Sequence, residues 1–324
     1  MREAARSGIR WYTNRLVRVL GVLTGFGIIA FVIAVGYGVG RVGVGGPQAG
    51  YVLNRIAFFI TNPALLFTVL AKEDIRTVVS GVGLAANIAA VIAGLVFLVL
   101  SRLFFRRPAA RTTIGVLASS YSNFNNIGIP VAVYVLGSPA YIAPVLLVQL
   151  IVFAPIALTV LDVTSRGRVS LRDILLNPVR NPMIIASVAG VVVAAFGWTL
   201  PDVVDSAFTL LGGAAVPLVL MAFGMSLHGS PPLKAVGARA EVIVATVFKV
   251  VLMPLIGWAL ARYGFHVTGH QLFVTVVLCA LPAAQNVYNF AARYERGEIV
   301  ARDAVLLSTI LSVPAVFVVA LLLT

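Results

Sequence analysis

Long apolar runs separated by short polar connections fill almost the whole chain of 324 residues. A transmembrane helix needs about 20 mainly apolar residues to cross a hydrocarbon core about 30 Å thick. Runs of this length, bounded by charged or turn residues, cover residues 18–40, 50–71, 79–101, 112–136, 140–162, 181–200, 203–227, 237–261, 270–292 and 300–323. The pattern predicts an all-α membrane protein with ten transmembrane helices.

Composition agrees with this class and argues against others. Hydrophobic residues make up 60% and charged residues 11% of the sequence, whereas soluble domains carry about 25% charged residues. The net charge of +13 lies in the connections between the runs, so it does not indicate nucleic-acid binding. The single cysteine, Cys279, excludes an internal disulfide and gives no sign of redox chemistry.

The basic residues predict how the chain is oriented in a plasma (inner) membrane. With both termini outside, most loop cations fall on the inside, where membrane proteins carry an excess of Lys and Arg. The inside connections would contain Arg41, Arg102, Arg106, Arg107, Arg111, Arg166, Arg168, Arg172, Lys234, Arg239, Arg293 and Arg296. A basic N-terminal arm over residues 1–17 argues for the opposite orientation. This arm is interpreted either as a helix on the membrane surface or as a disordered leader.

The longest polar connection divides the ten runs into five and five. Because five is odd, two equivalent halves must have opposite orientations in the membrane, as in an inverted repeat. We therefore expect a first five-helix repeat over residues 18–162, a cytoplasmic linker over 163–180 and a second five-helix repeat over 181–324. Prolines support the correspondence: Pro63 in the second run and Pro217 in the seventh are the predicted hinges.

The fourth run contains SNFNNIGIP, residues 122–130, within otherwise apolar sequence. In hydrocarbon, an unpaired backbone group costs several kcal/mol, so Pro and Gly persist only where protein or a watery cavity covers the freed groups. Pro130 frees the carbonyl of Asn126, and Gly128 lets the chain leave helical geometry at little steric cost. The amides of Asn123, Asn125 and Asn126 can satisfy the opened backbone or bind a solute. The stretch therefore predicts a broken helix.

The ninth run contains a second proline, Pro282, beside a cluster of polar side chains. The polar residues are Gln285, Asn286, Tyr288 and Asn289. Interrupted helices at corresponding places in two halves are the best sequence pointer to a transporter binding site near the midplane. We expect the fourth and ninth runs to form a substrate-binding site together. The alternative is that the amides only hold neighbouring helices together.

Lys249 is the only formal charge near the centre of any run. A central lysine costs about 2.5–3.5 kcal/mol on insertion scales, so it is expected to face a cavity or a partner. No Asp or Glu lies at mid-run to neutralise it. We expect Lys249 to counter an anionic substrate. The alternatives are a lysine that pairs with backbone carbonyls at the opened helices, or one whose ammonium group reaches the membrane surface.

Other motifs do not indicate catalysis. Glycines at residues 21, 25, 36 and 40 predict close helix packing, including at a homodimer interface. His266 and His270 lack a Cys or an acid to complete a metal site, so no metal or other cofactor is expected. No pair of acidic or nucleophilic residues has helical spacing inside the apolar runs, which argues against an enzyme.

Several segments resemble the auxin efflux carrier family of membrane transport proteins in order and spacing. They are LLGGAAVPLVLMAFGMSLHG (210–229), FKVVLMPLIGWALARYG (248–264), ALPAAQNVYNFAARYERG (280–297) and SNFNNIGIP. The resemblance implies a scaffold part and a transport part in which the fourth and ninth helices are broken and cross. It also implies export of small organic anions, with Asn123 and Pro130 at one crossing and Pro282 at the other. Val287 stands where the plant branch has a second proline, and the acidic residues of that branch's third span are missing. These departures argue against auxin itself as substrate and against a carboxylate-based proton site.

The leading hypothesis is therefore a secondary transporter that exports a small organic anion by alternating access. Helix N-termini that meet at one site attract an anion, and export is driven by the membrane potential or a proton gradient. A second hypothesis is a Na⁺-coupled symporter of the related bile acid symporter architecture, with Asn123, Asn126, Gln285 and Asn289 supplying oxygen ligands. A third is a membrane receptor that senses a solute.

Overall fold

The computed structural model describes residues 24, 27–72, 81–166, 181–226, 233 and 236–323. Regular structure in these ranges is helical, apart from one isolated bridge between Ser122 and Ala283. Among the described residues, six helices are long and apolar enough to cross a membrane: Ala49–Ala71, Gly81–Phe105, Pro139–Thr164, Asp202–Met225, Arg239–Gly264 and Glu298–Leu323. Shorter apolar helices are Gly27–Val42, Phe124–Leu136, Pro182–Phe196 and Gly269–Ala280. The predicted all-α membrane class is confirmed.

The described helices overlap the ten predicted apolar runs, and several extend beyond them by two to four residues. The fourth and ninth runs differ from the long spans because each holds two shorter helices with a break between them. The N-terminal arm over 1–17 and most of the expected linker lie outside the described residues. The start of that linker continues the helix Ala154–Arg166.

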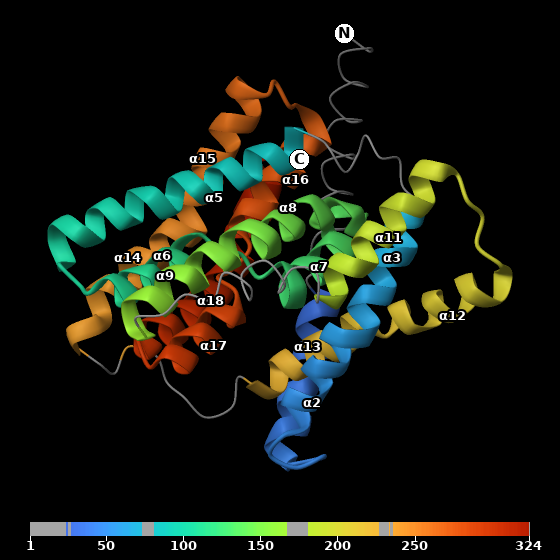
Figure 1. Cartoon of the computed structure of the whole chain (residues 1–324), viewed down its shortest axis with the longest axis horizontal. Helices are drawn as coiled ribbons and strands as arrows, with labels where there is room; N and C mark the ends of the chain where they lie inside the picture. The colour runs from blue at the N-terminus through green and yellow to red at the C-terminus, as the bar shows by residue number, and fades with distance from the viewer. Residues whose placement is uncertain are drawn as a thin grey trace, which may run out of the picture.

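One set of helices, which we call the α3 group, packs around α3. It comprises the helix Gly27–Val42, α2 (Ala49–Ile56), η1 (Ala57–Thr61), α3 (Asn62–Ala71), α11 (Pro182–Phe196), α12 (Asp202–Gly213) and α13 (Ala215–Ser226). Helices α11 and α12 pack on α3, and α13 packs on α2. Figure 1 shows α2, α3, α11 and α12 together on one side of the molecule.

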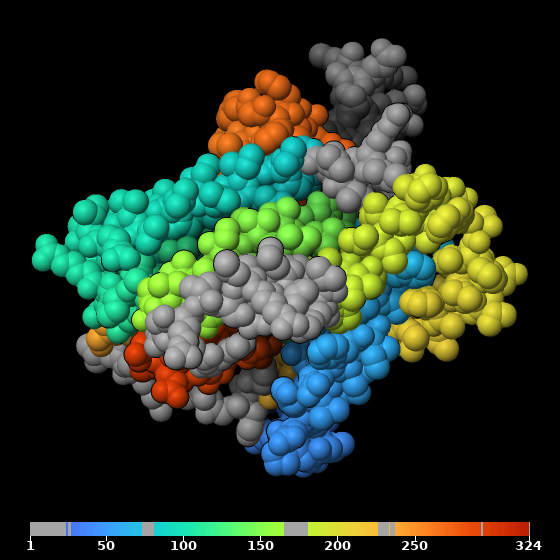
Figure 2. Space-filling model, in the orientation of Figure 1, coloured from blue at the N-terminus to red at the C-terminus, as the bar shows by residue number. Residues whose placement is uncertain are grey.

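The second set, the α5 group, contains the remaining long helices. They are α5 (Gly81–Leu100), η2 (Ser101–Phe105), α6 (Ala109–Ser120), α8 (Ile142–Val148), η6 (Gln149–Phe153), α9 (Ala154–Arg166), α14 (Arg239–Val247), η8 (Phe248–Leu252), α15 (Met253–Ala259), η9 (Leu260–Gly264), α16 (Gly269–Ala280), α17 (Gln285–Tyr294) and α18 (Glu298–Leu323). Helix α5 packs on α6, α15 and α16, and α18 packs on α14, α16 and α17. Figure 2 shows the same division in the space-filling view, with α5 and α9 on the opposite side from α11 and α12.

Glycines allow close helix contacts within the α3 group. An added Cβ at Gly190 on α11 would lie 2.8 Å from the Phe67 carbonyl oxygen of α3. At Gly224 on α13, it would clash with the Ile33 carbonyl oxygen of the first described helix. Gly36 and Gly40 lie against Met221 and Met225 of α13. The predicted close packing at Gly36 and Gly40 therefore occurs inside one chain, while the homodimer stays a prediction.

Four prolines inside the spans follow turns of π-helix. The turns η1, η3 (Phe124–Gly128), η6 and η8 come just before Pro63, Pro130, Pro155 and Pro254. Proline lacks an N–H and its ring clashes with the carbonyl four residues earlier. A π turn relieves this conflict because it bonds residues five apart. Pro217 instead lies in the first turn of α13, just after the change of helix at Ala214.

Candidate functional site

The first break lies where α6 ends and the π turn η3 begins. Helix α6 ends at Ser120, and Tyr121 is extended with ψ of 107°. Asn123 then begins η3, and its side-chain oxygen accepts from the Asn126 N–H at 3.0 Å. The predicted broken helix is confirmed, although the sequence reasoning put the loss of helical geometry at Gly128. Gly128 is helical, with φ of −63°, and an added Cβ there would lie 3.1 Å from Leu281, so close packing explains this glycine.

The second break separates α16 from α17. Helix α16 ends at Ala280, Leu281 is extended with ψ of 147°, and α17 begins at Gln285. Ala284 precedes α17 and no side chain caps the helix. The Val287 N–H donates to the Ala284 carbonyl at 3.0 Å, so the N–H groups of Gln285 and Asn286 are the donors that have no partner inside the helix.

The two breaks pair with each other through their backbones. The Asn123 N–H donates to the Pro282 carbonyl at 2.8 Å, and the Ala284 N–H donates to the Tyr121 carbonyl at 2.9 Å. These bonds form the bridge between Ser122 and Ala283. The predicted fourth and ninth spans therefore meet at their interruptions, as the proline and amide pattern indicated.

Side chains from two other helices form hydrogen bonds with the backbone at the two breaks. Gln149 of η6 is buried, accepts from the Ser122 N–H at 2.9 Å and donates to the Ser122 carbonyl at 2.8 Å. Ser308 of α18 accepts from the Ala283 N–H at 3.0 Å. The sequence reasoning missed both residues. The isolated glutamine in the apolar run VLLVQLIVF was the signal for the first, whereas a serine in a helix gives no comparable signal.

A chain of amides connects the α3 group to both breaks. Asn62 of α3 donates to Asn125 at 2.7 Å, Asn125 donates to Asn126 at 2.6 Å, and Asn126 donates to Gln285 at 3.2 Å. Asn62 is fully buried. It stands beside the predicted hinge Pro63, and the sequence reasoning gave it no binding role. Each amide oxygen after Asn62 therefore accepts a hydrogen bond from the amide before it.

A small cavity lies between the breaks. Its volume is about 20 Å³, enough for about one water-sized group. Five predicted site residues line it: Asn123, Asn125, Asn126, Gln285 and Asn286. Apolar side chains, including those of Phe58, Leu146, Leu150 and Met183, also line it. Asn123 Nδ2 is buried and has no hydrogen-bond partner among the described residues, so a donor is left free at this point.

Other predicted site residues lie outside the cavity lining. Pro130 and Pro282 are buried beside the breaks, and Tyr288 and Asn289 are exposed on α17. Lys249 is fully buried in η8, where its Nζ donates to the Cys279 carbonyl at 3.0 Å and contacts Met253 Sδ at 3.2 Å. Cys279 lies in the last turn of α16, whose partial negative charge a cation stabilises. The structure thus places Lys249 on a backbone carbonyl, which was one of the alternatives for it.

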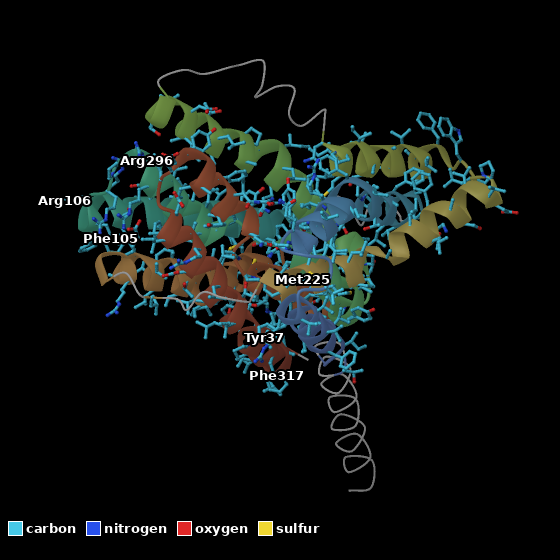
Figure 3. The ribbon with its side chains drawn as sticks, turned by 90° about the horizontal axis from the view of Figure 1, so that it is seen from below. Tyr37, Phe105, Arg106, Met225, Arg296 and Phe317 are labelled. Carbon is cyan, nitrogen blue, oxygen red and sulfur yellow. The ribbon has the colours of Figure 1, made fainter. Side chains whose placement is uncertain are left out.

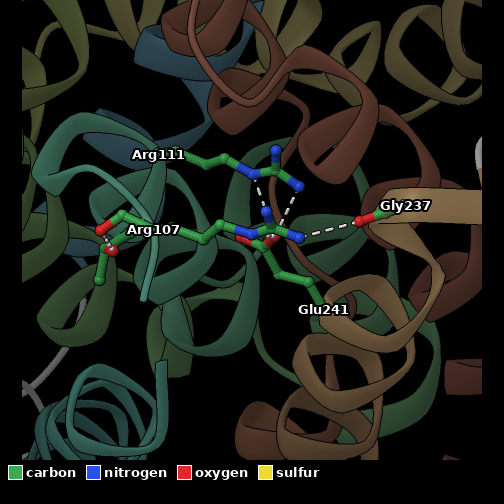
Figure 4. A network of polar contacts seen from close by, with 5 residues as sticks. Arg107, Arg111, Gly237 and Glu241 are labelled. Carbon is green, nitrogen blue, oxygen red and sulfur yellow. Dashed lines mark hydrogen bonds and ion pairs between the residues drawn. The ribbon is translucent and has the colours of Figure 1, made fainter. Parts of the chain in front are cut away.

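A charged network lies away from the cavity, near the start of α6. Glu241 of α14 is buried and accepts from Arg111 at 2.7 and 3.0 Å, while Arg107 lies 3.5 Å from the same carboxylate. Arg107 also donates to the Gly237 carbonyl at 2.9 Å (Figure 4). The network ties α6 to α14 by paired charges, so it has the character of a structural contact between helices.

Comparison with known proteins gives one family and several distant relatives. The family model described as "Membrane transport protein" matches residues 24–171 and 162–320. A "Putative malonate transporter" from Rhizobium meliloti is 26% identical over 274 residues, which are 82% of this chain and 84% of that protein. An uncharacterized transporter from Methanocaldococcus jannaschii is 22% identical over 274 residues, 83% of this chain and 88% of that protein. Another from Methanothermobacter thermautotrophicus is 24% identical over 292 residues, 88% of this chain and 92% of that protein.

Proposed function

The chain belongs to the membrane transport protein family, and from this premise we propose that it is an alternating-access secondary transporter that exports a small carboxylate. The relative named for malonate makes malonate the first substrate to test. The membrane transport class agrees with the resemblance to auxin efflux carriers, and no enzyme activity is proposed.

The observation that carries the proposal is the set of free donors at the paired breaks. The oxygens of Asn123, Asn125, Asn126 and Gln285 all accept hydrogen bonds. Asn123 Nδ2 and the uncapped start of α17 are left as donors beside the cavity. Such donors, together with the positive end of a helix, suit an anion. Na⁺ needs oxygen ligands, and the amide oxygens here already accept hydrogen bonds, although Ser122 Oγ beside the cavity has no partner among the described residues. The Na⁺-coupled symporter is therefore the second candidate.

Alternating access requires the site to change shape. A cavity of about 20 Å³ is too small for a dicarboxylate. We propose that the α5 group moves relative to the α3 group and thereby widens the cavity toward one side of the membrane at a time. The hydrogen bond from Asn62 to Asn125 ties the α3 group to the first break, which follows α6 of the α5 group, in the present conformation. Pro63 and Pro217 keep the predicted hinge role within this proposal.

We also propose the inverted five-helix repeat. It is supported by equivalent contacts in the two predicted halves. Gln149 in the fifth span and Ser308 in the tenth each satisfy the backbone of the break in their own half. Likewise, Gly190 packs the sixth span on the second, and Gly224 packs the seventh on the first. We further propose that both termini lie outside and that the protein is located in the inner membrane.

The driving force follows from the charge of the substrate. Moving one negative charge outward across an inside-negative membrane yields about 2.3 kcal/mol per 100 mV. Aspartate and glutamate are absent from the described cavity lining, so we propose that the membrane potential drives export. Coupling to a proton gradient is kept as the alternative.

Counterflow in proteoliposomes tests these proposals. Vesicles loaded with unlabelled malonate should accumulate radiolabelled malonate, and an imposed voltage should change net flux without any Na⁺ gradient. Flux that depends on Na⁺ would favour the symporter. Saturable binding without flux under any gradient would favour the solute sensor and overturn the transporter proposal.

A further inference from the structure

An apolar groove runs along the outer face of the α5 group, separate from the cavity at the breaks. It has a volume of about 500 Å³ and is formed by α5, α6, η6 and α9. Val91 and Leu95 of α5 and Ile156 of α9 line it and are 44%, 54% and 58% exposed. Figures 1 and 2 show α5 and α9 side by side on the face toward the viewer. Both helices belong to candidate membrane spans, so the groove faces hydrocarbon.

The floor of the groove depends on Gly94. An added Cβ at this glycine would lie 3.1 Å from Ser120 Oγ and 3.2 Å from Val116 Cγ1 of α6. The Ser120 hydroxyl already donates to the Val116 carbonyl at 2.8 Å, so it offers no free donor to a ligand. The floor thus combines close helix contact with satisfied polar groups, and it suits an apolar occupant.

The length of the groove matches one leaflet of a bilayer. Its lining on α5 and η2 extends from Ala90 to Arg102, which is about 18 Å at a rise of about 1.5 Å per residue. Half of a hydrocarbon core measures about 15 Å. The groove therefore reaches from one membrane surface to about the midplane.

A cation lies at the surface end of this groove. Arg102 lines it, is exposed, and forms no hydrogen bond or ion pair within the described part of the chain. Figure 3 shows Arg106 and Arg296 at one end of the molecule beside Phe105, which follows Arg102 in η2. An arginine at this depth can lay its stem along apolar surface and hold its guanidinium at the level of the lipid phosphates.

We propose that this groove binds one acyl chain of an anionic phospholipid, with the lipid phosphate on Arg102. An apolar channel one leaflet long with a free guanidinium at its mouth complements a lipid in both shape and charge. Such a lipid would contact Ser120, the last residue of α6 before the first break. The site requires only that the chain is embedded in a membrane, so it stands independently of the proposed transport substrate.

Native mass spectrometry of the full chain with defined lipids tests the proposal. Wild-type protein should retain one phosphatidylglycerol more strongly than phosphatidylcholine with the same chains. Arg102→Gln should lower phosphatidylglycerol retention by about tenfold, which corresponds to about 1.4 kcal/mol. Val91→Phe fills the groove and should abolish retention of the tightly held lipid.

Matched control variants show whether a loss of lipid retention comes from the groove itself or from any added bulk or lost charge. Val99 is another exposed valine of α5, 56% exposed and outside the groove lining, so Val99→Phe should retain lipid as wild type does. Arg262 in η9 is exposed and distant in sequence, so Arg262→Gln controls for loss of charge. A phospholipid with a diazirine in its acyl chain should label residues of α5, α6 and α9 around the groove. Equal retention by the Val91 and Val99 variants, or labelling spread over other faces, would overturn the proposal.

Discussion

The two breaks differ in how the helix that follows each one begins. At the first, the Asn123 side chain caps η3 by accepting from the Asn126 N–H. At the second, α17 begins after Ala284 without a side-chain cap. A helix N-terminus carries about half a positive charge and free N–H groups. The first break thus has a capped helix start but keeps Asn123 Nδ2 without a partner among the described residues, whereas the second break has an uncapped helix start. Within the proposed function, both breaks offer donors to an anion, and only the first also uses its asparagine to stabilise the helix.

The most severe effect is expected from Asn123→Ala, because it removes both the cap and the free donor. Transport should be abolished, and the loss of the cap should lower the free energy of unfolding by about 1 kcal/mol. Malonate counterflow and thermal unfolding of the purified protein measure the two effects. Asn123→Ser is the control: its hydroxyl can still cap η3, so stability should recover while transport stays low. Wild-type flux in Asn123→Ala would remove this residue from the site.

Asn286→Ala should also abolish transport, but without a loss of stability. Its side chain lines the cavity at the uncapped start of α17, and no described hydrogen bond depends on it. Counterflow and a melting temperature distinguish this outcome from that of Asn123→Ala. Asn289→Ala, on the exposed side of the same helix, is the matched control and should transport normally. Equal flux in the two variants would show that α17 does not bind substrate through Asn286.

Gln149 and Ser308, which hydrogen-bond the backbone at the two breaks, should differ in how much they contribute to stability. Gln149→Leu removes two hydrogen bonds from the Ser122 backbone and leaves its N–H unpaired, while the Ser122 carbonyl still accepts from the Phe124 N–H at 2.9 Å. Ser308→Ala removes one hydrogen bond and leaves only the Ala283 N–H unpaired. Each buried group without a partner costs about 1–3 kcal/mol. The melting temperature should therefore fall further in Gln149→Leu. A larger fall in Ser308→Ala would mean that the second break depends more on its support.

The smallest effect on substrate affinity is expected from Lys249→Met. Lys249 bonds the Cys279 carbonyl and lies outside the cavity lining. The KM for malonate should stay within about twofold of wild type, which is less than about 0.5 kcal/mol. Concentration-dependent counterflow measures this value. A rise in KM of tenfold or more would return Lys249 to the predicted role of counter-charge to the anion.

The helices and their interruptions could be predicted from the sequence because apolar run length and proline act locally. Residues of both broken runs that were predicted as a site line one cavity, as Asn126 and Gln285 illustrate. The exact point of each break could not be read in the same way. Proline at position 130 marks where a helix is weakened, but the chain opens at Tyr121 to Asn123, where the other break supplies backbone partners.

Contacts between distant residues set the limits of the sequence prediction. Lys249 finds its partner 30 residues away and Asn62 finds its partner 63 residues away. A single sequence shows that such polar side chains are costly in hydrocarbon, but it does not show which of several buried acceptors they reach. The role of Gln149 depends in the same way on where η6 passes the first break.

The backbone bridge between the breaks restricts how the molecule can move. Separating Tyr121 and Asn123 from Pro282 and Ala284 would strip two hydrogen bonds from a water-poor interior, where each orphaned group costs several kcal/mol. Within the proposed alternating access, we therefore expect the two paired breaks to move together as one rigid unit. We expect relative movement instead at contacts such as that between Asn62 and Asn125, where one side-chain hydrogen bond can be exchanged for a bond to water or substrate.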